Sequence, residues 1–176
     1  MTPANEFSHM VTVEPWPDDG ISLALTANAS EREALRVRFD LIDLETLSAS
    51  VVFEKRMTEL RLAGTIEALV TQSCVATLKP VKATLNIPFE RCYRSPAMQE
   101  KLGAGKLDDL DDDADVEIFD GHEIDLGEIV AEEFYLALAP YPRAADADQI
   151  LDDIQERTSL SIGERKENPF EKLRQH

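Results

Sequence analysis

The residues of this 176-residue chain best suited to chemistry are two cysteines and three histidines. The thiols are Cys74 and Cys92, and His9, His122 and His176 are scattered, with no C-x-x-C or H-x-x-x-H spacing. Structural and catalytic metal sites are commonly recognised in a sequence by such short ligand spacings. The sequence therefore predicts no metal site and no cofactor.

Two interpretations of Cys74 stay open. As a nucleophile it would need a base and an orienting group beside it, and no histidine is near it in sequence. As a buried structural thiol it needs only packing, and we favour this interpretation. Glycine motifs that cradle phosphates and the G-x-S-x-G nucleophile motif are absent from the sequence. We therefore expect no enzyme activity and, in a reducing compartment, no disulfide.

The chain is acidic, with 18 Lys and Arg residues, 35 Asp and Glu residues and a formal net charge of -17. Residues 28–106 carry twelve basic and ten acidic residues, so the acidity is concentrated in the remaining segments. Residues 107–133 carry thirteen acidic residues and no Lys or Arg. Such a surface repels a phosphate backbone and attracts basic proteins. A basic protein is therefore the expected partner, with indirect or local RNA contact left open.

The elements that must position these residues begin with two long strands in residues 61–89. Apolar residues alternate before and after a central turn that contains Lys79 and Pro80, so each strand should bury one face. A third strand is expected over residues 47–53. Residues 7–13 and 21–25 alternate as well and are predicted to form an N-terminal hairpin.

Capping signals predict two helices. Ser30 and Glu33 fit a capping box for a helix over residues 31–39, and Asp125 is a good N-cap for a helix over residues 126–138. Along the second helix, five apolar residues share one face: Leu126, Ile129, Val130, Phe134 and Ala137. A short strand is expected near residues 116–119. The predicted fold class is α+β, with an antiparallel sheet of five to seven strands, open or barrel-like, covered by two or three helices.

The domain organisation is predicted as a single α+β domain over residues 1–143 and a flexible charged tail over 144–176. Residues 103–115 are expected to be an acidic flexible loop, because six aspartates fall within residues 108–115 and lack the spacing of a calcium-binding loop. In the tail, Asn168, Pro169 and Phe170 form a short motif that we expect to dock, either on its own domain or on a partner. The sequence has no long apolar run and no signal-peptide pattern, so we expect a cytoplasmic protein without membrane contact.

Four stretches together resemble the YceD family, the large ribosomal RNA subunit accumulation proteins. They are EFS at 6–8, QSCVATLKPV at 72–81, IDLGEIVAEEFYLALAPYP at 124–142 and NPFEKL at 168–173. The resemblance covers nearly the whole chain and implies support of the synthesis, processing or stability of 23S ribosomal RNA in bacteria.

Many YceD members carry C-x-R-C at the central turn and further cysteines after the late helix, which suggests a metal-binding pair. Here Ala76 and Thr77 stand where the Arg and the second Cys would be, and no cysteine follows Cys92. The chain resembles the cysteine-poor, alphaproteobacterial-like branch, so a zinc role is not carried over.

These observations predict a non-catalytic accessory factor for 23S rRNA accumulation and large ribosomal subunit biogenesis, acting through protein or RNA contacts. An RNA-processing enzyme with an unrecognised site is the alternative. The expected partner is a basic ribosomal or assembly protein rather than a small molecule. The candidate interaction residues are Cys74, Lys79, Pro80, Lys82, Asp125, Leu126, Asn168, Pro169 and Phe170.

Overall fold

The computed structural model describes residues 6–13, 20–56, 59–96, 100, 116–119 and 121–161. The expected acidic loop at 103–115 and the docking motif at 168–170 lie outside these residues. The chain divides into two compact units, which are described separately: residues 1–72 with 82–140, and residues 73–81 with 141–176. The boundary expected after residue 143 stays a prediction.

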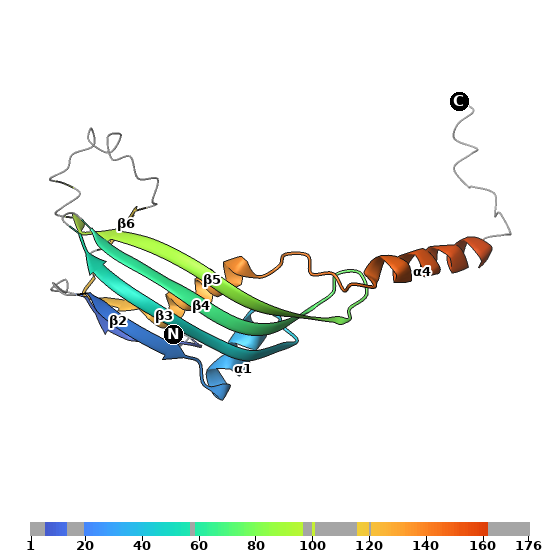
Figure 1. The fold of residues 1–176 in the computed structure, drawn as a ribbon, viewed down its shortest axis with the longest axis horizontal. Helices are drawn as coiled ribbons and strands as arrows, with labels where there is room; N and C mark the ends of the chain where they lie inside the picture. Colours follow the sequence, from blue (N-terminus) through green and yellow to red (C-terminus); the bar gives the residue numbers. More distant parts are fainter. Residues whose placement is uncertain are drawn as a thin grey trace, which may run out of the picture. The chain divides into compact units, whose positions relative to one another are not determined.

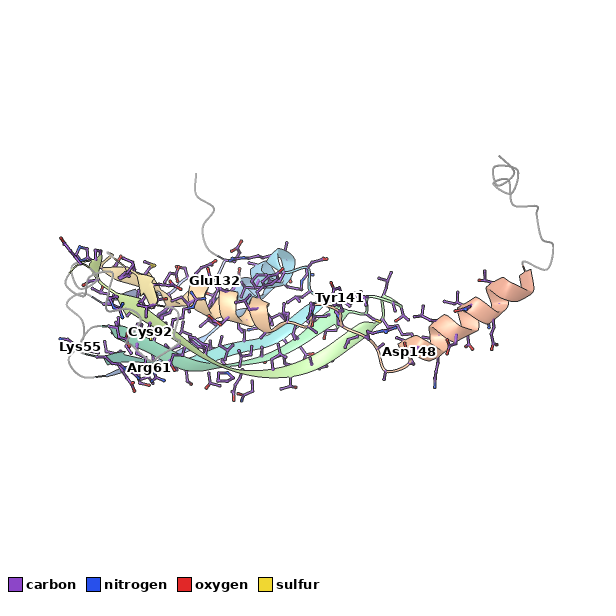
Figure 2. The ribbon with its side chains drawn as sticks, turned by 90° about the horizontal axis from the view of Figure 1, so that it is seen from above. Lys55, Arg61, Cys92, Glu132, Tyr141 and Asp148 are labelled. Carbon is purple, nitrogen blue, oxygen red and sulfur yellow. The ribbon has the colours of Figure 1, made fainter. Side chains whose placement is uncertain are left out.

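The described residues of the first unit form a five-stranded sheet and a two-stranded sheet, together with helices that pack on the larger one. The five-stranded sheet has the order β2 (Ile21–Thr26), β3 (Asp43–Lys55), β4 (Leu60–Ser73), β5 (Pro80–Arg94) and β6 (Val116–Ile118), the turn between β4 and β5 belonging to the second unit. A two-stranded sheet pairs β1 (Met10–Thr12) with β7 (Glu123–Asp125). Helices α1 (Ala29–Arg38) and α3 (Leu126–Ala137) lie on the same side of the five-stranded sheet (Figures 1 and 2).

The core lies between the sheet and these two helices. The predicted alternation is confirmed in β3 from Leu47 to Phe53 and in β4 from Leu60 to Val70, where alternate residues other than Gly64 are buried and the residues between them face the other side of the sheet. The largest fully buried side chains come from both layers: Phe53, Phe134, Leu35, Leu47, Leu60, Leu62, Ile66 and Leu126. The structure therefore has the expected α+β class, with the sheet covered on one face.

Strand pairing differs from the prediction in two places. Strands β1 and β2 do not form a hairpin, because β1 pairs with β7 and β2 pairs antiparallel with β3 over six residues, from Ile21 opposite Phe53 to Thr26 opposite Ser48. Strand β6 runs parallel to β5, so the sheet is mixed, and the described residues form an open sheet and no closed barrel. For β1 and β2, pairing with residues distant in sequence outweighs the local turn signal between them.

The first helix begins two residues earlier than predicted, because its capping box is built on Asn28. The Asn28 side chain accepts from the backbone N–H groups of Ser30 and Glu31 at 2.9 and 3.1 Å, and Glu31 accepts from the Asn28 N–H at 2.7 Å. The predicted box on Ser30 is wrong, and Glu33 instead pairs with Arg36 at 2.7 Å. Asparagine caps a helix as well as serine does, so the sequence alone could not decide between Asn28 and Ser30 as the N-cap.

In the second unit, helix α4 (Ala147–Ser161) lies within the segment that was predicted as the tail. None of the described helices is long and apolar enough to cross a membrane.

Candidate interaction surface

The central turn between β4 and β5 is closed by its own backbone. The Cys74 N–H donates to the Lys79 carbonyl at 2.8 Å, and the Leu78 N–H donates to the Cys74 carbonyl at 2.9 Å. Leu78 has a positive φ of 59°, which reverses the chain there. Pro80 follows as the exposed first residue of β5, where its missing N–H costs no ladder hydrogen bond.

The Cys74 sulfur is a buried acceptor inside the second unit. The Ala144 N–H donates to its Sγ at 3.3 Å, and the Val75 N–H donates to the Pro142 carbonyl at 2.9 Å. The Thr77 side chain and the Ala144 N–H both favour the thiolate and lower the pKa of Cys74 to about 7. Cys74 and Cys92 are both free and buried. The sulfur thus ties the segment around residue 144 to the turn.

This lowered pKa predicts a pH dependence of stability. The folded state favours the Cys74 thiolate, so its stabilising contribution is present above the pKa of an unfolded thiol and is lost as pH falls through about 7. Between pH 7 and pH 9 the melting temperature of the wild type should therefore rise relative to that of Cys74→Ser, which does not titrate there.

Cys92→Ser is the matched control for this experiment, because burial raises the pKa of the Cys92 thiol. A raised thiol pKa contributes stability at low pH that is lost as pH rises, so no relative gain between pH 7 and pH 9 is expected for Cys92. Parallel pH profiles for the wild type and Cys74→Ser would contradict the assignment of Cys74 as a stabilised thiolate.

The two lysines expected to reach a partner hold carboxylates of their own units. Lys79 Nζ lies 2.6 Å from Asp146, and Lys82 Nζ lies 2.5 Å from Glu45. Lys79 lowers the pKa of the Asp146 carboxyl, mainly through the hydrogen bond that it donates. Both lysine side chains are about half exposed, so their interaction role stays a proposal and competes with these ion pairs.

Asp125 caps α3, as predicted, and also fastens the N-terminal segment. Its carboxylate accepts from the backbone N–H groups of Gly127 and Glu128 at 3.0 and 3.3 Å. It also accepts from the Ser8 hydroxyl at 2.7 Å and from the His9 N–H at 2.8 Å. Asp125 therefore stabilises two segments that lie more than a hundred residues apart in sequence.

Leu126 is fully buried, so it belongs to the core. Its N–H donates to the His9 carbonyl at 2.9 Å. The described part of the chain contains no group of three or more His, Cys, Asp or Glu side chains placed to hold a metal ion, and the prediction of no metal stays a prediction.

A surface that the sequence interpretation missed lies over α1 and α3, on the side of α3 that faces away from the core. A cavity of about 360 Å³ is lined by Phe39, Gln72, Tyr135, Leu136, Leu138, Ala139 and Pro140. A second of about 270 Å³ is lined by Arg38, Phe39, Arg91, Glu132, Tyr135 and Leu136. The two cavities share Phe39, Tyr135 and Leu136, and we call them together the helical groove.

Apolar residues are unusually exposed along this groove. Tyr135 is 55% exposed and Leu136 is 74% exposed, while Phe134 beside them is fully buried. The Phe39 and Tyr135 rings stack with centroids 5.0 Å apart. The signal was present in the sequence, because the five apolar residues predicted to share one face of this helix leave Tyr135 and Leu136 on another face.

The structure is thus an α+β protein with two helices on one sheet face, an acidic surface and an apolar groove. A comparison with known families matches residues 62–175, more than half of the chain, to the family described as large ribosomal RNA subunit accumulation protein YceD. The chain belongs to the YceD family, whose name implies a role in accumulation of the large ribosomal RNA. Neither the curated proteins nor the solved structures contained a match to the chain.

Proposed function

We propose that this chain is a non-catalytic accessory factor that supports 23S rRNA accumulation and large ribosomal subunit biogenesis in the cytoplasm. It acts through contact with a basic ribosomal or assembly protein. The family assignment supports the ribosomal part of the proposal. The contact with a basic protein is supported by one observation. Arginines of the first unit are surrounded by carboxylates.

Three arginines each hold at least two carboxylates. Arg38 binds Glu128 at 2.6 Å and Glu6 at 3.1 Å. In the same way, Arg61 binds Glu90 and Glu54, and Arg91 binds Glu133, Glu132 and Glu117. A phosphate group approaching any of these arginines would compete with carboxylates already bound, whereas a basic side chain would find excess negative charge.

The test is complementation of a strain that lacks the gene, with 23S rRNA measured relative to 16S rRNA. The wild-type chain should restore the ratio, and affinity capture should recover large-subunit proteins equally well with and without nuclease. Capture abolished by nuclease would favour direct RNA binding and overturn the protein-contact part of the proposal.

We further propose that the docking motif at Asn168, Pro169 and Phe170 binds the partner. Deletion of residues 167–176 should leave the melting temperature unchanged, because a short polar segment with few apolar residues adds little to a folded core. The deletion should lower the 23S to 16S ratio in the complemented strain.

A full-length variant with Asn168, Pro169 and Phe170 changed to alanine separates the motif from the length of the tail. It should lower the ratio as far as the deletion does. A normal ratio in both variants would show that the motif has no part in the function.

A further inference from the structure

We infer that the helical groove binds an apolar, Lys- or Arg-bearing segment of a basic protein. An apolar side chain of that segment would sit against Phe39, Tyr135 and Leu136, and its cation against the carboxylates on the groove's edge. The inference deepens the proposed function, on which it rests, by assigning the surface that meets the partner.

The apolar floor of the groove consists of Phe39, Tyr135 and Leu136. It lies over α1 and α3, which are held in place by the residues that they bury in the core. Phe39 follows α1, and its ring packs against both the buried Phe134, with centroids 5.9 Å apart, and the half-exposed Tyr135. Leu136 lines both cavities together with Phe39 and Tyr135, and it is more exposed than Tyr135. A cavity of about 360 Å³ is large enough for a side chain, and burial of Tyr and Leu there would supply the apolar centre that protein interfaces need.

Two arginines line the groove, and the carboxylates that hold them outnumber them. Arg38 is held by Glu128 and Glu6, and Arg91 is held by Glu132 at 2.9 Å and Glu133 at 2.8 Å. Glu132 lines the groove from α3, on the side of the sheet where both helices lie (Figure 2). Its side chain is 46% exposed, so it can accept a second cation while it holds Arg91. The charge therefore complements a Lys or Arg of the partner.

Two other occupants fit these observations less well. A second copy of the chain would have to place the same acidic edge against itself in a symmetric dimer, which costs repulsion. An RNA strand would bring phosphates to arginines that already hold carboxylates, although its bases could stack on exposed aromatic rings. The basic protein segment satisfies both the apolar floor and the acidic edge.

The first experiment identifies the occupant by crosslinking in living cells. A photo-crosslinking phenylalanine analogue is placed at residue 136 of the full chain, and at residue 52 as a control on the opposite, outer face of the sheet. The expected adduct at residue 136 resists nuclease, and protease digestion of the adduct releases peptides of a basic protein partner. An adduct destroyed by nuclease, an adduct of twice the chain's mass, or none above the level at residue 52 would each overturn the inference.

The second experiment tests whether the contact matters. Leu136→Glu adds one negative charge to the groove, and Val52→Glu adds the same charge at a partly exposed position on the other sheet face. With RNA-free protein extracted from the large ribosomal subunit as the probe, Leu136→Glu should weaken binding about tenfold or more, as loss of a central apolar contact does. Val52→Glu should bind as the wild type does. Circular dichroism and melting temperatures check that both variants fold.

Restoration of 23S rRNA in the null strain tests the groove assignment and the proposed function separately. If the wild-type chain restores 23S rRNA in the null strain and Leu136→Glu restores it equally, the groove assignment fails while the proposed function stands. If the wild-type chain itself does not restore 23S rRNA, the proposed function fails. Loss of restoration by Leu136→Glu alone, with Val52→Glu intact, supports both.

Discussion

Replacement of Gly127 by alanine is expected to lower the free energy of unfolding by about 3 kcal/mol, near the upper end of the usual cost of overpacking. An alanine Cβ at this position would lie 2.5 Å from the Phe7 carbonyl oxygen and 2.8 Å from the Ser8 Cα. These are backbone atoms, so no side-chain rotation relieves the contact. Movement of the backbone would strain the bonds of Asp125 to Ser8 and His9.

Helix propensity acts in the opposite direction at this position, since alanine is favoured over glycine by about 1 kcal/mol in a helix interior. The steric term should outweigh it. Chemical denaturation monitored by circular dichroism gives the measurement, and Gly20→Ala is the matched control. The nearest contact of a Cβ at Gly20 would be 3.3 Å, to the Phe53 carbonyl oxygen, so a smaller effect is expected there. Equal stability of Gly127→Ala and wild type would contradict the close approach of residues 7–8 to α3.

Truncation of Phe134 to alanine should cost about 3–5 kcal/mol, as is usual for a large aromatic side chain lost from a core. Phe134 is fully buried and packs against the Phe39 ring. The cavity would lie within the hydrophobic core, whose close packing limits collapse around it. Urea denaturation of the variant should show a lower midpoint with an unchanged slope.

Tyr135→Ala is the internal comparison, because the two residues are adjacent on α3 and differ in burial. Tyr135 is more than half exposed and contributes mainly its stacking on Phe39, so its truncation should cost about 1 kcal/mol or less. If the helical groove binds a partner, Tyr135→Ala should weaken that binding more than it weakens the fold. Equal losses of stability in both variants would mean that Tyr135 belongs to the core.

Local patterns in the sequence were sufficient for most of the secondary structure. The alternation in residues 47–53 and 60–70 predicted strands, because the side chains of a strand point alternately to its two faces. The Asp125 cap and the apolar face after it predicted α3 almost to the residue, with the helix ending at Ala137. Such signals are contained within a few neighbouring residues, so no distant partner is needed to interpret them.

Predictions that depended on a choice between similar local signals were less accurate. Asn28 and Ser30 are both competent N-caps, and only the position of the Glu31 side chain decides for Asn28. The turn signals between residues 13 and 21 are compatible with a hairpin. The neighbours of β1 and β2 are instead β7 and β3, which sequence alternation alone cannot select.

By itself, the sequence determined the α+β class, the long strands, the presence of α1 and α3 and the uneven distribution of acidic charge. These properties follow from short-range periodicity and from counts of residues. The tertiary structure decided the strand neighbours, the parallel direction of β6, the hydrogen bond from Ser8 to Asp125 and the stacking of Phe39 on Tyr135. Each of these brings together residues far apart in the chain, and such contacts form only where packing of the whole core makes them favourable.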